Sequence, residues 1–384
     1  MVFLEENEYK KFYIISCIRR KIMNNEKINK RMQLIIEVGE EILTDEELKT
    51  LVETKEHPIA YDGFEPSGTS IHIAQGLLRA ININKMTAAG CKFKMLIADW
   101  HAWANNKMGG DLEKIQKVGN FYIEVWKACD MDIKNVEFVW ASDLAKDTNY
   151  WKMVMNVGRN SSMQRILRTV EIMGRSEKDT LHASQIFYPC MQAADIFYLK
   201  ADICQLGMDQ RKVNVLAREV GEKLGLWKPI IVSHHMLMGL GEPPKEGLEG
   251  AERGIALKMS KSKPDTAIFM LDTKEDVERK IKKAYCPEKK VEENPLLEYC
   301  KYIIFEKVDE IKIKRPEKFG GNLTIKRYEE LEKLFGEGKL HPMDLKTAVA
   351  EYLNHLMDPI RKKLHENKKA MKLYEEIKGF EVTR

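Results

Sequence analysis

Two lysines in the segment 258–262, which reads Lys-Met-Ser-Lys-Ser, have the spacing of a phosphate-binding pair. Ammonium groups three residues apart, at Lys258 and Lys261, can hold the β- and γ-phosphates of a nucleotide through a transition state. Hydroxyl groups at Ser260 and Ser262 add further hydrogen-bond donors. A string of Lys and Ser in a loop is, on its own, usually solvated surface. The segment therefore needs a second motif before it indicates a nucleotide site.

The second motif is Tyr-Asp-Gly-Phe-Glu-Pro-Ser-Gly at residues 61–68, followed by His-Ile-Ala-Gln at residues 72–75 at the start of an expected helix. Gly63 and Gly68 would let the backbone approach a ligand closely after a strand. At a helix N-terminus, His72 would lie beside free N–H groups and the positive end of the helix dipole, which suits a phosphate. The alternative is that His72 only caps its helix.

A third group of residues has the character of a small polar pocket. Tyr188, Gln192 and Asp195 are spaced by four and then three residues, so they share one face of a helix. A carboxylate in so apolar a helix needs a partner, and a phenol hydroxyl that also contacts Tyr61 would supply one. The amino group of the same substrate would contact Tyr188, Gln192 and Gln210. The alternative is that Asp195 caps a neighbouring helix or pairs with a lysine.

The expected elements that position these residues alternate between short apolar strands and amphipathic helices. The expected strands are 58–64, 92–99, 136–141, 202–206 and 230–233, and the expected helices are 71–89, 112–129 and 209–224. This alternation predicts an α/β fold, with a Rossmann-like parallel sheet covered by helices on both faces. Helical periodicity from about residue 150 to 199 interrupts the alternation. We expect it to be an insertion between two halves of the sheet.

The chain is expected to divide into three parts. Residues 1–32 are an N-terminal extension, whose first 22 residues are either an extra helix or a segment upstream of a true start at Met23. Residues 33–285 form the sheet-containing catalytic domain, and residues 286–384 form a mainly α-helical domain apart from one Gly-Gly turn. The stretch 239–254 is rich in Gly, Pro and Glu, and we expect a mobile loop that closes over a nucleotide.

Composition excludes several classes of protein. No apolar run approaches the roughly 18 residues that span a bilayer, so no transmembrane helix is expected. Seven cysteines are scattered without a C-x-x-C pair, which argues against a disulfide framework and a zinc site, and for reduced core thiols in the cytosol. The net charge is only +4, so a nucleic-acid site must be a local patch. Two candidate patches, Lys312–Arg327 and Arg361–Lys372, each hold six basic residues and one acidic residue.

Residues 61–75 and 258–262, in this order around a βα sheet, resemble the two signatures of class I aminoacyl-tRNA synthetases, written H-I-G-H and K-M-S-K-S. The pattern Y-P-x-M-Q-x-x-D at residues 188–195 and G-M-D-Q-R-K at residues 207–212 is similar to the tyrosine pocket of archaeal and eukaryotic tyrosyl-tRNA synthetases. The resemblance covers residues 33–384. One departure is Gln75, which stands where the second histidine of the first signature is usual.

The resemblance implies an enzyme that activates L-tyrosine with ATP and transfers it to the 3′ end of tRNA(Tyr), with Mg²⁺ assisting at the phosphates. Tyr61 and Asp195 would grip the substrate hydroxyl. Residues implied in catalysis are His72, Gln75, Lys258 and Lys261; in tyrosine binding, Tyr61, Gly63, Tyr188, Gln192, Asp195 and Gln210; and in ATP binding, Gly63, His72, Lys258, Met259, Ser260, Lys261 and Ser262. No resident metal site and no membrane partner are implied, and the location would be cytoplasmic.

The resemblance also implies contacts with tRNA and with a second copy of the chain. Phe319, His341 and Asp344 would read the first anticodon base, and Arg211 would lie near the acceptor end. The alternative for His341 and Asp344 is structural: His341-Pro342 would begin a helix, and Asp344 would cap it. A homodimer would form around the inserted helices.

Two other functions remain open from the sequence. A tryptophanyl-tRNA synthetase would share the sheet and both signatures, and an indole N–H could also donate to Asp195. Tyr61 favours tyrosine, because a second polar partner suits a hydroxyl better than an N–H. A synthetase-like RNA-binding protein without aminoacylation would account for Gln75.

Overall fold

The computed structural model describes residues 25–175, 180–244, 247–248, 250–260 and 264–382. The strands of its central sheet are β1 (Gly39–Leu43), β2 (Ile59–Phe64), β3 (Lys92–Ile97), β4 (Val136–Trp140), β5 (Ile203–Gly207) and β6 (Ile230–His234). Their order is β1-β6-β5-β2-β3-β4, and all neighbours are parallel except β1, which is antiparallel to β6 at one edge. The predicted α/β sheet is confirmed. In such sheets a ligand binds at the carboxyl ends of the strands where the winding reverses, here between β2 and β5.

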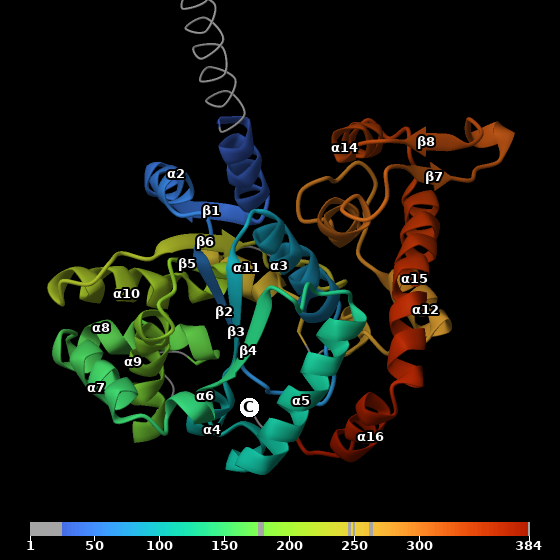
Figure 1. The fold of residues 1–384 in the computed structure, drawn as a ribbon. Coiled ribbons are helices and arrows are strands. Elements are labelled where there is room, and N and C mark those ends of the chain that lie inside the picture. The colour runs from blue at the N-terminus through green and yellow to red at the C-terminus, as the bar shows by residue number, and fades with distance from the viewer. Residues whose placement is uncertain (1–24, 176–179, 245–246, 249, 261–263, 383–384) are drawn as a thin grey trace, which may run out of the picture.

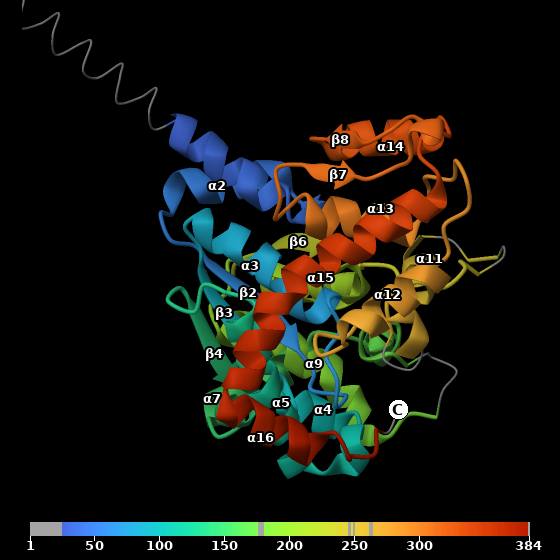
Figure 2. The same ribbon diagram turned by 90° about the vertical axis from the view of Figure 1, so that its right-hand side faces the viewer.

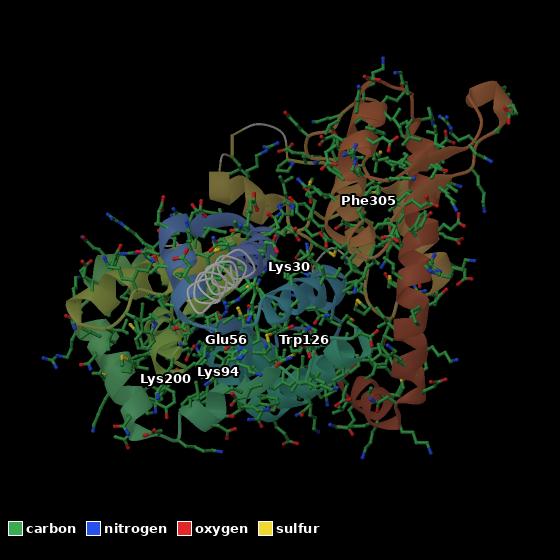
Figure 3. The ribbon with its side chains drawn as sticks, turned by 45° about the horizontal axis from the view of Figure 1, so that its top comes forward. Lys30, Glu56, Lys94, Trp126, Lys200 and Phe305 are labelled. Atoms are coloured by element: carbon green, nitrogen blue, oxygen red, sulfur yellow. The ribbon has the colours of Figure 1, made fainter. Side chains whose placement is uncertain are left out.

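Helices cover both faces of the sheet, as predicted. They are α3 (Arg79–Ala88) and α5 (Leu112–Ala128) on one face, and α7 (Thr148–Arg159), α9 (Ala183–Tyr198) and α10 (Arg211–Lys223) on the other. Successive residues of β2 point to opposite faces, so Ala60 and Phe64 enter one core and Tyr61 enters the other. Figure 1 shows the two helical layers. In Figure 3, Trp126 marks α5 in one layer and Lys200 follows α9 in the other.

The predicted helical insertion lies between β4 and β5. Besides α7 and α9 it contains α8 (Met163–Leu167) and η3 (Val170–Met173), and it is preceded by α4 (Asp99–Ala104), η2 (Lys107–Gly110) and α6 (Ala141–Leu144). Local signals explain where the longer helices start. Asp111 caps α5 by accepting from the Lys114 N–H over 3.1 Å, and Asp147 caps α7 in the same way.

Residues 25–36 form a helix that packs onto the sheet domain, followed after β1 by α2 (Asp45–Thr54). The guanidinium of Arg31 is buried and donates to the carbonyls of Val52, Glu56 and Ala89 over 2.6 to 2.8 Å. The boundary predicted at residue 32 therefore falls inside a helix that is integrated into the domain.

The described residues of 286–384 are mainly helical, as predicted, and α12 (Lys274–Lys283) precedes them. They contain α13 (Pro295–Tyr299), η6 (Cys300–Ile304), β7 (Ile311–Ile313), η7 (Glu317–Phe319), β8 (Leu323–Ile325), α14 (Tyr328–Gly336), α15 (Pro342–Glu366) and α16 (Lys368–Ile377). The Gly-Gly turn joins a two-stranded hairpin, β7–β8, that the sequence did not predict. Both glycines have positive φ, +94° at Gly320 and +69° at Gly321, which favours glycine at this reversal. Figure 2 shows α15 crossing this side of the molecule, with α16 beside α5.

Two segment predictions were wrong in part. The helix expected over 71–89 begins only at η1 (Ala74–Leu78), because residues 71–73 instead form backbone hydrogen bonds with residues 268–270. The loop expected over 239–254 ends early, because α11 (Gly250–Leu257) occupies its last residues.

The charged patch at residues 361–372 is largely engaged within the chain. Lys363 pairs with Asp130 over 2.5 Å, and Lys369 pairs with Glu124 over 3.0 Å, so this part of α15 and α16 is tied to α5 and the residues after it. The six described cysteines are buried and free, as predicted, while Cys17 lies outside the described residues. None of the described helices is long and apolar enough to cross a membrane.

Candidate active site

A cavity of about 280 Å³ opens at the carboxyl ends of β2 and β5, where the topology predicts a ligand site. It brings together every predicted tyrosine-binding residue and most of the predicted ATP-binding residues. Those lining it are Tyr61, Gly63, His72, Gln75, Tyr188, Gln192, Asp195, Gln210, Lys258 and Met259. Ser260 is described but does not line the cavity, and Lys261 and Ser262 lie outside the described residues.

Asp195 lines the cavity with no exposed surface, and two side chains that the sequence did not predict hold its carboxylate. Tyr150 donates a hydrogen bond from its hydroxyl to Oδ1 over 2.9 Å. His101 Nε2 lies 3.0 Å from Oδ2, which is close enough for an electrostatic contact but is not aligned as a hydrogen bond. These contacts compensate for the burial of a carboxylate while leaving Oδ2 able to accept a hydrogen bond from a ligand.

Tyr61 is the neighbouring polar group, and its side chain is 1% exposed. Burial, and then the nearby charge of Asp195, raises the pKa of Tyr61 well above its ordinary value, so the phenol keeps its proton. A Cβ atom added at Gly63 would lie 2.9 Å from the Tyr61 hydroxyl oxygen. Gly63 therefore makes room for Tyr61 itself, in addition to facing the cavity where the sequence predicted space for a ligand.

The predicted amino-group site contains a row of linked amides. Gln192 Nε2 donates to Gln210 Oε1 over 3.0 Å, and Gln210 Nε2 donates to the Ile172 carbonyl over 2.9 Å. The side-chain oxygen of Gln192 is buried and accepts no hydrogen bond among the described residues, which suits an ammonium ligand. Burial, followed by the charge of Glu65 and a hydrogen bond to it, raises the pKa of Tyr188 well above its ordinary value.

Where the sequence predicts the nucleotide, the residues after the second signature hold the first signature in place. His72 forms an antiparallel bridge with Phe269, and its carbonyl accepts from the N–H groups of Gln75 and Gly76, both over 2.9 Å. η1 begins after Ile73, whose side chain makes no capping hydrogen bond, and the His72 side chain lines the cavity. The Gln75 side-chain oxygen is buried without a partner among the described residues, which leaves it able to accept from a ligand.

Lys258 extends from the second signature and pairs with Asp209 of η4 (Met208–Gln210) over 2.8 Å. Its backbone faces Met238 in an isolated antiparallel bridge, and the next residue, Met259, donates its N–H to the Leu237 carbonyl over 2.8 Å. The ammonium is therefore presented to the cavity from a fixed backbone, and its side chain is 33% exposed.

Several polar residues that were not predicted also line the cavity, among them Asp62, Arg79 and His234. Asp62 and Arg79 form a buried ion pair of 3.2 Å, and burial raises the pKa of Asp62 to about 6 although Arg79 opposes the shift. Burial, and then the charge of Arg79, lowers the pKa of His234 to about 3, so this imidazole is neutral and contacts Gln205 over 2.6 Å. The sequence could have indicated this ion pair through Asp62, because a carboxylate inside an apolar strand needs a partner.

The predicted tRNA-binding residues lie away from the cavity. Arg211 pairs with Glu41 of β1 over 2.7 Å. His341 caps α15 by accepting from the Met343 N–H over 3.1 Å, so it begins a helix as the structural alternative proposed, whereas Asp344 is not that cap. The backbone of Phe319 lies in η7, and its side chain lies outside the described residues. In the part of the chain that the structure describes, no cluster of His, Cys, Asp or Glu could hold a metal ion.

Comparison with known proteins agrees with this geometry. The family model of class I tRNA synthetases for tryptophan and tyrosine (W and Y) matches residues 53–358. Tyrosine--tRNA ligase 1, cytoplasmic, from Arabidopsis thaliana is 52% identical over 94% of this chain and 91% of its own length. Tyrosine--tRNA ligase from Thermococcus sibiricus is 42% identical over 93% of this chain and its own full length.

Among solved structures, tyrosyl-tRNA synthetase from Pyrococcus horikoshii complexed with L-tyrosine has a TM-score of 0.84 and 41% identity, covering 91% of this chain and 99% of that one. Tryptophanyl-tRNA synthetase from Aeropyrum pernix, at 18% identity and a TM-score of 0.62, shares the fold. The chain therefore belongs to the tyrosyl-tRNA synthetases of the archaeal and eukaryotic type, and it is an aminoacyl-tRNA ligase that joins tyrosine to tRNA at the expense of ATP.

Proposed function

We propose that the cavity holds tyrosine and ATP side by side, so that the tyrosine carboxylate attacks the α-phosphate in line. The bond to pyrophosphate breaks and tyrosyl-adenylate forms. The observation that carries this proposal is the buried carboxylate of Asp195 in the same cavity as the Lys258 ammonium. No side-chain nucleophile is required, because positioning and charge stabilisation supply the catalysis.

In the tyrosine half, the substrate hydroxyl donates to Asp195 Oδ2 and accepts from the Tyr61 phenol. Both protein groups are buried, so a phenylalanine ring would leave them unpaired, and that penalty is the basis of selection. The substrate ammonium meets Gln192, whose side-chain oxygen is available, together with Tyr188 and Gln210.

In the ATP half, Lys258 and His72 stabilise the charge that develops on the phosphates, and Gln75 takes the place of a second histidine as a hydrogen-bonding group. Met259 lines the cavity, and Ser260, Lys261 and Ser262 complete the phosphate site in this proposal. Mg²⁺ would arrive bound to the phosphates of ATP, where it would neutralise part of their charge. The lysine ammonium acts as a point charge at the same phosphates.

The second step transfers tyrosine to the terminal ribose hydroxyl of tRNA(Tyr). Arg211 guides the acceptor end, and Phe319, His341 and Asp344 read the first anticodon base. Support comes from the hairpin β7–β8, because Arg315 donates to the Lys339 carbonyl over 2.8 Å and so joins the hairpin to the start of α15. Charging of transcripts altered at the first anticodon base would test this, since Asp344→Ala should reduce the discrimination.

We also propose that the chain is a homodimer in the cytoplasm. The inserted helices and α4 expose an apolar groove lined by Trp100, Trp103, Trp151 and Phe187, and two of these side chains, Trp103 and Phe187, are 46% and 49% exposed. Exposed aromatic residues of this density are typical of an interface. Sedimentation should show a dimer, and a double variant, Trp103→Glu with Phe187→Glu, should sediment as a monomer. The name of the Arabidopsis relative supports the location.

The proposed division into an extension (1–32), a catalytic domain (33–285) and an anticodon-binding domain (286–384) accompanies this function, although the helix at residues 25–36 spans the first boundary and packs onto the catalytic domain. α12 precedes the second boundary but packs against α15 beyond it, so the two domains share a core.

Pyrophosphate exchange into ATP tests the proposal most directly, with tyrosine, tryptophan or phenylalanine as the only amino acid. Exchange that depends on tyrosine alone is expected. Exchange with tryptophan would overturn the proposed role of Tyr61, and folded protein that binds tRNA without any exchange would instead be an RNA-binding protein.

A further inference from the structure

Residues 237–239 form a short extended segment after β6, and one of its edges supports the second signature. The Leu237 carbonyl accepts from the Met259 N–H over 2.8 Å, and the Gly239 N–H donates to the Leu257 carbonyl over 2.9 Å. These two partners lie on either side of Lys258. Met238, in the middle of the segment, faces Lys258 in an antiparallel bridge. The backbone position of Lys258 is therefore set by this segment.

The other edge of the same segment is bound by side chains of α13. Glu298 Oε2 accepts from the Met238 N–H over 2.9 Å, and the Tyr299 hydroxyl donates to the Met238 carbonyl, also over 2.9 Å. Met238 and Tyr299 are 2% and 0% exposed. Both the N–H and the carbonyl of the buried Met238 are thus hydrogen-bonded to side chains of α13, a helix in the C-terminal part of the chain.

Glu298 is held in turn by a partly buried imidazole. The oxygen that accepts from Met238 lies 3.0 Å from His235 Nε2, while His235 Nδ1 lies 3.1 Å from Glu40 of β1. The imidazole stacks on Tyr302, with ring centroids 4.3 Å apart. Burial lowers the pKa of His235, but the hydrogen bonds to Glu298 and Glu40 outweigh it and raise the pKa to about 9. The carboxylate of Glu298 therefore has a cationic partner at neutral pH.

We propose that Glu298 and Tyr299 are positioning residues for adenylate formation, which hold Met238 and, through it, Lys258 at the phosphates of ATP. The proposal rests on the role proposed above for Lys258. It extends the ATP site to α13, a helix in the part of the chain otherwise assigned to tRNA recognition. Charge stabilisation of a transition state depends on placement, since an error of about 1 Å can cost about 10²-fold in rate.

The experiment compares three single variants of the full chain in tyrosine-dependent pyrophosphate exchange. Glu298→Ala and Tyr299→Phe each release one backbone group of Met238, and we expect kcat/KM for ATP to fall about 10-fold with the first and less with the second. KM for tyrosine should not change, because its binding residues lie on β2, α9 and η4. Glu40→Ala is the matched control: it removes the other partner of His235 but leaves both contacts to Met238, and it should stay within about 2-fold of the parent.

A double-mutant cycle with Lys258→Ala separates positioning from general weakening of the fold. If Glu298 acts through Lys258, Glu298→Ala should cause no further loss once the lysine is absent. A fully additive loss would overturn the positioning role. A Lys258→Ala enzyme with normal exchange would instead overturn the proposed role of Lys258 itself. If Glu298→Ala does not fold, the same cycle is measured with Tyr299→Phe, which removes only one oxygen atom, in combination with Lys258→Ala.

Discussion

The two parts of the cavity that we propose for tyrosine and for the nucleotide, the tyrosine half and the nucleotide half, are built in different ways. In the tyrosine half, Tyr61, Tyr150 and Asp195 are each at most 1% exposed, and side-chain contacts within the protein hold the carboxylate in place. In the nucleotide half, the side chains of Lys258 and Asp209 are 33% and 14% exposed, and backbone pairing between distant segments holds the lysine. One half consists of buried groups that contact one another, whereas the other presents charged groups that are partly exposed.

This difference follows from what each half must recognise. A single phenol hydroxyl distinguishes tyrosine from phenylalanine, so selection needs buried groups that are costly to leave unpaired. ATP phosphates carry several charges, which exposed ammonium groups can bind without burial. We therefore expect substitutions in the tyrosine half to change selectivity and those in the nucleotide half to change rate.

The largest effect is expected for Asp195→Asn, which replaces the proposed acceptor of the substrate hydroxyl. Loss of a buried charge with its partners left in place costs about 3–5 kcal/mol, so kcat/KM for tyrosine should fall about 10³-fold. Exchange kinetics and tyrosine titration calorimetry measure it. ATP affinity should be retained, and a parallel loss of ATP binding would show that the two halves are not separate.

Lys258→Ala should give the next largest effect, in the opposite half. Removing one group that stabilises transition-state charge costs about 10²-fold in rate, while tyrosine affinity should be unchanged. Single-turnover formation of the adenylate and equilibrium tyrosine binding separate the two quantities. Equal losses in both would count against a role for this lysine at the phosphates.

The sequence predicted the strands and site residues that depend on a local pattern. Strands β2 to β6 are short apolar runs bounded by turns, and Tyr188, Gln192 and Asp195 follow helical spacing, so both were found. β1 was missed because Gly-Glu-Glu-Ile-Leu has neither a long apolar run nor alternation, and it is a strand only through its pairing with β6.

Tyr150 and His101 were missed for a related reason. They lie on α7 and α4, far from Asp195 in the chain, and a tyrosine on the apolar face of a helix is usually a core residue. Only the packing of three helices brings them to one carboxylate. The same holds for Glu298, whose contacts with His235 and Met238 span about 60 residues of sequence.

Tyr150→Phe sharpens the comparison within the tyrosine half. It removes the hydrogen bond to Asp195 Oδ1 but leaves the ring, so the core should be kept. A hydrogen bond to a charged group contributes about 1.5–3 kcal/mol, and part of it should be recovered by the substrate hydroxyl. We expect about a 10-fold loss in the preference for tyrosine over phenylalanine, measured by exchange with each amino acid. An unchanged preference would show that His101 alone orients the carboxylate.

The smallest expected effect is a pH dependence confined to the nucleotide half. His235 has a folded pKa of about 9, above its ordinary value near 6.5, so its stabilising charge is fully present below about pH 6.5 and is lost as pH rises through 9. Because the side chain is 20% exposed, we expect a loss of only about 1 kcal/mol between pH 7 and 9, a fall in Tm of about 2–4 °C. Thermal unfolding at both pH values measures the fall, with His235→Gln as the control that should abolish it. Over the same range kcat/KM for ATP should fall while the preference for tyrosine stays constant, because the contacts of His235 are with Glu298, Glu40 and Tyr302 and not with Asp195. A preference that changed with pH would show that the two halves are coupled.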